Sequence, residues 1–284
     1  MRVAVASGKG GTGKTTVSVN LAASLAAVRP VQVVDCDVEE PNAGLFLRPT
    51  IRRETEVSLP VPAVKADRCT GCGACAQACA FNAIVVLGRQ AIVFPELCHG
   101  CGACVAACTY GALAVERRRL GTIAAGVARG GSLEFLEGRI DTGVSLAVPV
   151  IRALKRQSRD AGVADVIYDA PPGTACPVVA TLRDSDFVIL VTEPTPFGRH
   201  DLGLAVQLVE ELGLPCGVVI NRIGIGDAAI DEFCAAKRIP ILMAIPFDRL
   251  YAEAIAAGEL LVDRFPEWRS RFIDLWRRIE GMTS

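Results

Sequence analysis

The chain has 284 residues, of which 51% are apolar, 21% charged and 5% aromatic, and its formal net charge is −1 at pH 7. This composition excludes an intrinsically disordered chain, and the nearly balanced charge gives no basis for nucleic-acid binding. Apolar runs such as residues 187–191 are only as long as a strand, whereas a membrane span needs roughly 18 residues, and the first residues do not match a signal peptide. We therefore expect a cytoplasmic protein.

The chain begins with a predicted strand, a glycine-rich turn and a helix. Residues 2–6 form a short apolar run, and a helical pattern continues to about residue 28. The turn and the start of the helix contain Gly8, Lys9, Gly10, Gly11, Thr12, Gly13, Lys14, Thr15 and Thr16. This order predicts a P-loop, whose backbone N–H groups surround a phosphate at a helix N-terminus. We expect Lys14 to contact the β- and γ-phosphates of ATP and the Thr15 hydroxyl to bind Mg²⁺.

Two further predicted strands end in carboxylates. Residues 31–34 are followed by Asp35 and Asp37, and residues 166–168 are followed by Asp169. Because parallel strands deliver the residues at their ends to one edge of the sheet, we expect these side chains beside the P-loop. A single Asp after a strand is usually a helix cap, whereas three of them beside a P-loop predict carboxylates that hold Mg²⁺ through water or orient an attacking water.

Between the second and third of these strands lies a duplicated cysteine pattern. Eight of the twelve cysteines form two Cys-x2-Cys-x2-Cys-x3-Cys runs at a constant offset. Such runs are typical of two-cluster ferredoxins, in which the fourth cysteine of a run binds the other cluster. We assign Cys69, Cys72, Cys75 and Cys108 to one [4Fe-4S] cluster, and Cys98, Cys101, Cys104 and Cys79 to the second.

Disulfides and zinc are weaker interpretations of the same cysteines. Disulfides would need an oxidising compartment, which nothing in the sequence supports. Structural zinc sites usually have two Cys-x2-Cys pairs separated by a longer loop, not three cysteines at successive spacings of three. We therefore predict an inserted two-cluster ferredoxin domain at residues 64–116.

The remaining sequence alternates between strands and helices. Residues 187–192, 216–221 and 241–245 predict buried parallel strands, and residues 199–212 and 227–237 predict helices. The predicted fold is therefore α/β, with a mostly parallel P-loop NTPase sheet flanked by helices at residues 1–63 and 117–284. The bacterial-type ferredoxin insert would be a small α+β domain.

Lys9 to Thr16 resemble the deviant Walker A motif of the MinD, Mrp and nitrogenase iron protein class of P-loop ATPases. Residues 192–198, 221–222 and 245–248 are similar to the MinD-superfamily subgroup that carries an inserted ferredoxin domain. The resemblance implies an ATP-bound homodimer in which Lys9 crosses to the phosphates of the second subunit. It implies catalytic roles for Lys9, Lys14 and Asp37, with Asp37 positioning the water, and a Mg²⁺ site at Thr15, Asp35 and Asp169. It also implies nucleotide contacts by Asn221, Arg222, Pro246, Phe247 and Asp248.

The C-terminal stretch predicts an amphipathic helix. Its apolar face contains Trp268, Phe272, Leu275, Trp276 and Ile279, and several arginines lie nearby. A basic amphipathic helix of this kind can bind a membrane surface. The interspersed acidic residues dilute the positive charge, so we expect this face to pack against the ATPase domain and not to contact a membrane.

The combination of a P-loop and two clusters favours an ATPase that gates electron transfer to or from an unidentified redox partner. One alternative is a positioning or assembly ATPase whose insert docks on a scaffold protein or senses redox state. A third interpretation, an iron–sulfur cluster carrier, fits less well because Mrp-like carriers use a C-terminal Cys-x2-Cys that this sequence lacks.

Overall fold

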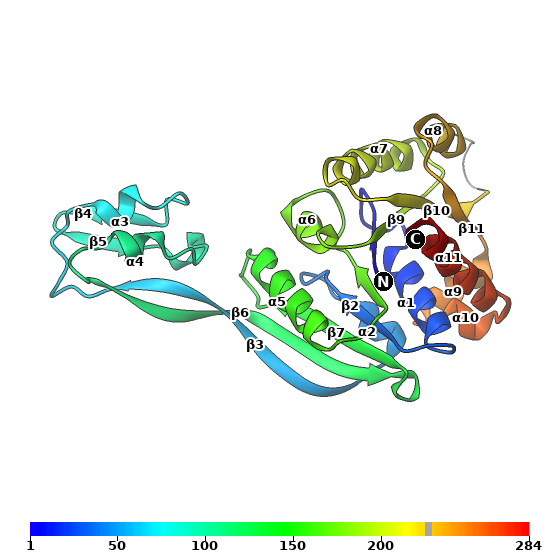
Figure 1. The fold of residues 1–284 in the computed structure, drawn as a ribbon, viewed down its shortest axis with the longest axis horizontal. Helices are drawn as coiled ribbons and strands as arrows, with labels where there is room; N and C mark the ends of the chain where they lie inside the picture. Colours follow the sequence, from blue (N-terminus) through cyan, green and yellow to red (C-terminus); the bar gives the residue numbers. More distant parts are fainter. Residues whose placement is uncertain (225–228, 284) are drawn as a thin grey trace. The chain divides into compact units, whose positions relative to one another are not determined.

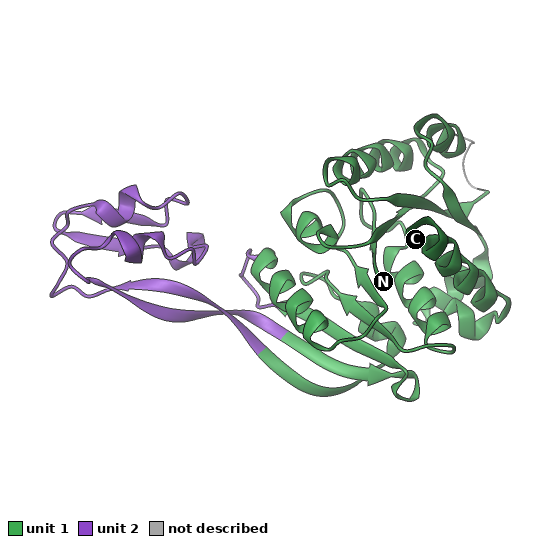
Figure 2. Cartoon of the chain, in the orientation of Figure 1, with its two compact units in different colours: residues 1–55, 123–139, 147–284 green, residues 56–122, 140–146 purple. Residues whose placement is uncertain are grey.

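The computed structural model describes residues 1–224 and 229–283, and the chain divides into two compact units (Figure 1). The first unit contains Met1–Thr55, Ile123–Arg139 and Ala147–Ser284. The second contains Glu56–Thr122 and Ile140–Leu146 (Figure 2). Residues 64–116, where we predict the insert, all fall in the second unit.

The first unit is built on a parallel sheet. Its strands β1 (Arg2–Ala6), β2 (Val31–Asp35), β8 (Val166–Asp169), β9 (Phe187–Thr192), β10 (Cys216–Ile223) and β11 (Ile241–Pro246) each begin at the residue that the sequence predicts. The neighbouring strands among them pair in parallel, which confirms the predicted α/β class. The order β11-β10-β9-β1-β8-β2 places β1, and the P-loop that follows it, in the middle of the sheet.

Three strands extend this sheet beyond the prediction. They are β7 (Leu133–Ile140), β6 (Leu113–Ala128) and β3 (Thr50–Val64), in the order β2-β7-β6-β3. The first seven residues of β3 are all exposed and include charges on both faces, so the alternation of apolar and polar residues that signals a strand is missing there. Strands β3 and β6 both continue from the first unit into the second (Figure 2).

Helices flank the sheet of the first unit. They are α1 (Lys14–Leu25), α2 (Ala43–Leu47), α5 (Ala147–Asp160), α6 (Cys176–Leu182), α7 (Pro196–Glu211), α8 (Ala229–Lys237), α9 (Arg249–Ala256), α10 (Leu261–Arg264) and α11 (Glu267–Thr283). Helix α7 begins three residues before the predicted start, because the Thr195 side chain caps it by accepting a hydrogen bond from the Gly198 N–H at 3.0 Å. The predicted start of the next helix, Asp227, lies outside the described residues.

Helix α11 packs into the core of the first unit. Its residues Trp268, Phe272, Leu275, Trp276 and Ile279 are all buried and belong to the same apolar cluster as α1. Figure 1 shows α1, α9, α10 and α11 beside one another, in agreement with their contacts. The predicted packing of this face is therefore confirmed. Across residues 1–224 and 229–283, no helix has the length and apolar character needed to span a membrane.

The second unit contains short elements around the eight clustered cysteines. They are α3 (Ala74–Gln77), the antiparallel hairpin of β4 (Ile84–Leu87) and β5 (Gln90–Val93), a 3-10 turn at Pro95–Leu97, and α4 (Ala103–Ala107). Its apolar core includes Cys75, Ile84, Ala91, Cys104 and Leu113. Cysteines thus lie inside the core of this unit as well as at its surface.

Candidate functional site

The P-loop connects β1 to the N-terminus of α1. Gly13 precedes the helix with φ of 98°, and a Cβ atom there would lie 2.3 Å from Nδ2 of Asn221. Only glycine fits both this backbone conformation and this close approach. Nδ2 of Asn221 donates a hydrogen bond to the Thr12 carbonyl at 2.9 Å. The end of β10 therefore holds the P-loop in place, while Asn221 also reaches the nucleotide side of the loop.

Lys14, the first residue of α1, is buried among carboxylates. Burial lowers its pKa from the ordinary value, and the nearby Asp169, Asp37 and Asp35 each raise it. Only 7% of the Lys14 residue is exposed. A lysine surrounded in this way remains close to three negative charges and can present its ammonium group to an anion at the helix N-terminus.

Asp35 and Asp169 are register partners at the ends of the neighbouring strands β2 and β8. Both are fully buried, and burial raises the pKa of each, that of Asp169 to about 6. The Asp35 carboxylate accepts hydrogen bonds from the backbone N–H groups of Asp37 at 3.0 Å and of Asn42 and Ala43 at 2.9 Å. Asp35 thus organises the loop that positions Asp37.

Asp169 differs from Asp35 because half of its carboxylate is unpartnered. Oδ1 accepts a hydrogen bond from the Ser18 hydroxyl at 2.9 Å, whereas the buried Oδ2 has no hydrogen-bond partner among the described residues. Thr15 lies close enough for its hydroxyl to lower the pKa of Asp169. A buried carboxylate oxygen without a partner beside a hydroxyl is suited to a hydrated cation.

A cavity of about 440 Å³ opens along the P-loop. Of the predicted nucleotide, catalytic and Mg²⁺-binding residues, Gly10, Gly11, Gly13, Lys14, Thr15, Thr16, Asp37, Asn221, Arg222, Pro246, Phe247 and Asp248 line it, whereas Gly8, Lys9, Thr12, Asp35 and Asp169 do not. The Asp248 carboxylate also caps α9, since Oδ1 accepts a hydrogen bond from the Leu250 N–H at 2.7 Å. The same cavity is thus lined both by the polar P-loop and by apolar residues such as Pro246 and Phe247.

Sequence reasoning did not identify several other residues that line this cavity. They include Glu40, Asn42, Phe46, Pro172, Tyr251, Ile255 and Leu261. Tyr251 and Ile255 are separated by one helical turn on α9, directly after the predicted residues 246–248. That spacing was a usable signal, whereas Phe46 and Leu261 reach the cavity only through the tertiary fold.

Lys155 on α5 anchors the helix that follows the Asp169 loop. Its buried ammonium donates hydrogen bonds to the carbonyls of Thr181 at 2.6 Å, Ala180 at 3.3 Å and Arg183. The same ammonium lies 4.7 Å from the centre of the Tyr168 ring, which immediately precedes Asp169. Lys155 therefore connects the end of α6 to the strand that carries the buried carboxylate.

Replacing Lys155 with methionine should lower the free energy of unfolding by roughly 3 kcal/mol, because three carbonyls lose a charged donor in a buried setting. Urea unfolding of the nucleotide-free protein measures this change. Arg156→Met is the matched control, since Arg156 is the next residue on α5 and is exposed. Equal stability of the two variants would contradict the anchoring role.

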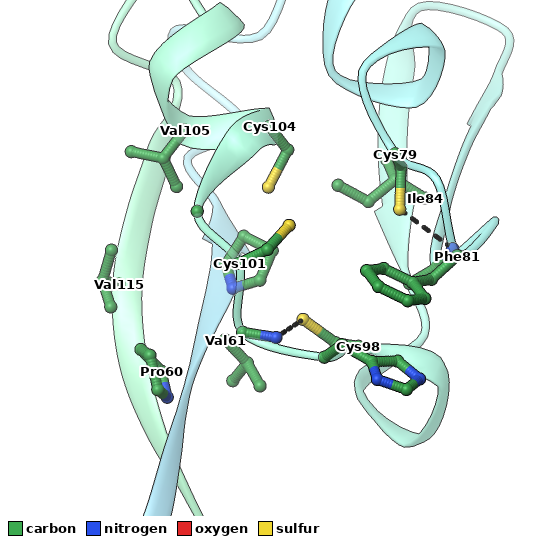
Figure 3. Close-up of a pocket in the computed structure, with 15 residues that line it drawn as sticks. Pro60, Val61, Cys79, Phe81, Ile84, Cys98, Cys101, Cys104, Val105 and Val115 are labelled. Atoms are coloured by element: carbon green, nitrogen blue, oxygen red, sulfur yellow. Dashed lines mark hydrogen bonds between the residues drawn. The ribbon is translucent and has the colours of Figure 1, made fainter. Parts of the chain in front are cut away.

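The eight cysteines of the two runs line two cavities in the second unit. Cys69, Cys72, Cys75 and Cys108 line one of about 20 Å³, and Cys79, Cys98, Cys101 and Cys104 line another of about 70 Å³. Figure 3 shows the four sulfur atoms of the second set turned toward one another. Each cavity thus combines three thiols of one run with the fourth thiol of the other run.

Backbone geometry wraps each run around its cavity. Gly71, Gly73, Gly100 and Gly102 have φ of 72°, 85°, 67° and 77°. Four thiols accept backbone N–H contacts, namely Cys69 from Ala91 at 3.4 Å, Cys79 from Ala83 at 3.3 Å, Cys98 from Gly100 at 3.4 Å and Cys108 from Ala112 at 3.3 Å. Burial raises the pKa of the Cys75 and Cys104 thiols. Among residues 1–224 and 229–283, no three His, Cys, Asp or Glu side chains are arranged to hold a single metal ion.

Comparison with known proteins finds a family and relatives that match most of the chain. The family model described as the CobQ/CobB/MinD/ParA nucleotide binding domain matches residues 3–262. An uncharacterized protein of Methanocaldococcus jannaschii is 31% identical over 266 residues, which are 91% of this chain and 90% of that protein. An iron-sulfur cluster carrier protein of Bacillus subtilis is 53% identical over 64 residues, 21% of this chain and 18% of the carrier.

Solved structures show the same fold. The septum site-determining protein MinD of Pyrococcus horikoshii, in complex with Mg-ADP, is similar with a TM-score of 0.60 and 20% identity, covering 100% of this chain and 98% of that one. A MinC:MinD cell division protein complex of Aquifex aeolicus is similar with a TM-score of 0.62 and 17% identity, covering 99% and 96%. At these identities, the likeness establishes the fold and not the function.

Proposed function

The chain belongs to the CobQ/CobB/MinD/ParA nucleotide-binding family, and we propose that it is an ATPase whose nucleotide-dependent dimer controls electron transfer through two [4Fe-4S] clusters. The clusters would pass electrons to or from a redox partner protein. The observation that carries this proposal is that β3 and β6 run without interruption from the unit with the P-loop into the unit with the eight thiols.

The nucleotide side of the proposal is supported by the P-loop and the buried carboxylates. Phosphates would lie against the N-terminus of α1, where Lys14 can balance their charge. Thr15 and Asp169 would hold Mg²⁺, which suits the unpartnered Oδ2 of Asp169. Asp37 lines the same cavity beside Lys14, so its carboxylate could orient the water that attacks the terminal phosphate.

The cluster side is supported by the grouping of the thiols. In a [4Fe-4S] cube each cysteine binds a different iron, so four thiols spread around a cavity suit a cube even though no three of the described side chains would hold one ion. The N–H contacts to Cys69, Cys79, Cys98 and Cys108 would stabilise negative charge on sulfur. Such contacts also tune the reduction potential of a cluster, whose chemistry is one-electron transfer.

The proposed function needs only a modest coupling free energy between nucleotide binding and the reduction potential of a cluster. A one-electron potential changes by about 59 mV for each tenfold change in equilibrium. A shift of about 120 mV therefore requires roughly 2.8 kcal/mol of difference in nucleotide binding between the oxidised and reduced states, within the usual range of allosteric coupling.

A redox titration of the anaerobically purified protein tests the proposal. We expect the potential of at least one cluster to differ by about 60 mV or more between the protein with a non-hydrolysable ATP analogue and the protein with ADP. Identical potentials in both states and without nucleotide would contradict gated electron transfer. Nucleotide-dependent localisation of a partner with unchanged potentials would favour the positioning ATPase, and rapid loss of iron to a chelator would favour the carrier.

A further inference from the structure

Glu193 is a buried carboxylate beside the P-loop that the function described so far does not use. It follows β9 directly, and the residue is only 8% exposed. Its Oε2 lies 3.8 Å from Nζ of Lys9, and its Oε1 accepts a hydrogen bond from the guanidinium of Arg222. One carboxylate therefore joins the first lysine of the P-loop to an arginine that lines the nucleotide cavity.

The backbone around Glu193 is held firmly against the P-loop. A Cβ atom at Gly198 would lie 2.2 Å from the Glu193 carbonyl, and a Cβ atom at Gly8 would lie 2.1 Å from the carbonyl of Asp201 on α7. The Thr192 hydroxyl also donates a hydrogen bond to the Gly198 carbonyl at 3.0 Å. Because the chain packs so closely here, Glu193 has little room to follow a movement of Lys9.

Lys9 is the more exposed partner of this ion pair. Its side chain is 35% exposed, whereas that of Glu193 is 10% exposed, and Lys9 does not line the nucleotide cavity of its own subunit. If Lys9 leaves, the buried Glu193 keeps the contact with Arg222. The release of Lys9 therefore does not leave an isolated buried charge, which would otherwise make the movement prohibitively unfavourable.

We propose that Glu193 is a positioning residue that holds Lys9 in its own subunit and so sets the ATP concentration at which two copies assemble. This inference rests on the proposed function, in which Lys9 crosses to the phosphates of a second copy. Lys9 cannot contact Glu193 and those phosphates at the same time. Assembly must therefore break the pair, and Arg222 takes over the remaining charge of Glu193.

Assembly of the full-length Glu193→Gln variant tests the proposal. Sedimentation velocity with Mg²⁺ and a non-hydrolysable ATP analogue should show half-assembly at an analogue concentration about fivefold lower than in the wild type. Glu210→Gln is the matched control, because Glu210 on α7 forms an exposed pair with Lys237 on α8 at 3.3 Å, and it should not shift the midpoint. A structural defect would weaken assembly, so an unchanged or higher midpoint for Glu193→Gln overturns the proposal.

Labelling of Lys9 examines the pair without assembly. In the nucleotide-free protein, an amine-reactive reagent followed by mass spectrometry should modify Lys9 severalfold faster in Glu193→Gln than in the wild type, with the exposed Lys65 as the internal standard. In the wild type, higher salt should also speed Lys9 labelling relative to Lys65, since salt screens ion pairs. This second comparison uses only the wild type, so it stands even if the variant folds poorly. Equal rates in both comparisons overturn the proposal.

If the wild type never assembles with nucleotide, the dimer switch of the proposed function fails, while labelling still decides whether Glu193 holds Lys9.

Discussion

The Lys14→Ala variant is expected to bind Mg-ADP and Mg-ATP about a hundredfold more weakly than the wild type. Lys14 stands at the N-terminus of α1 and lines the cavity, so it would make charge-assisted hydrogen bonds to the phosphates. Two such bonds, each contributing about 1.5 kcal/mol or more, account for this loss. Isothermal titration calorimetry with Mg-ADP measures it.

The Lys9→Ala variant is the natural control for this loss, because both lysines belong to one loop. Lys9 does not line the cavity of its own subunit, so its removal should change the affinity for Mg-ADP by less than about threefold. An equal loss in both variants would mean that the loop had collapsed. Full affinity in Lys14→Ala would contradict the phosphate site.

The Lys14→Ala variant should also change how the free energy of unfolding depends on pH. Without Lys14, the carboxyl groups of Asp35, Asp37 and Asp169 lose a neighbouring positive charge, so their pKa values, already raised by burial, rise further. A carboxyl group whose pKa is higher in the folded chain stabilises the fold while it is protonated, and this contribution is lost as the pH rises through the folded-state pKa. Urea unfolding should therefore show a larger deficit relative to the wild type at pH 8 than at pH 5.

The sequence predicts the framework of the nucleotide site because local patterns determine it. Buried parallel strands appear as short apolar runs, and the six predicted strands of the first unit begin where they are expected. The glycines with a left-handed backbone conformation and the lysine at the start of α1 are likewise close neighbours in the sequence. These features depend on neighbours in sequence, so a single sequence is sufficient to find them.

Long-range contacts explain what the sequence could not predict. Glu193 and Lys9 are far apart in the chain and meet only because β9 lies next to β1 in the sheet. Asp35 is predicted by resemblance to hold Mg²⁺ through water, and its carboxylate also accepts hydrogen bonds from three backbone N–H groups that only the folded loop brings to it. Strand β3 escaped prediction because its exposed half has no apolar alternation and its neighbour in the sheet, β6, is distant in sequence.

Replacement of Cys101 with alanine should remove about half of the iron from the anaerobically purified protein. Two [4Fe-4S] clusters would give about eight iron atoms per chain, and the loss of one ligand should release about four. Cys72→Ala should have the same effect on the other cluster. Cys176→Ala is the matched control, because Cys72, Cys101 and Cys176 are all exposed while Cys176 lies in neither thiol cavity.

Double variants decide how the thiols are shared between the clusters. Cys79 belongs to the first run in sequence but lines the cavity of Cys101, and not that of Cys72. If Cys79 and Cys101 bind one cluster, their double alanine variant keeps about four iron atoms, because both changes damage the same site. The Cys72 and Cys79 double variant then loses nearly all iron. If each run instead binds its own cluster, the two results are exchanged, so an iron assay alone separates the crossed arrangement from the uncrossed one.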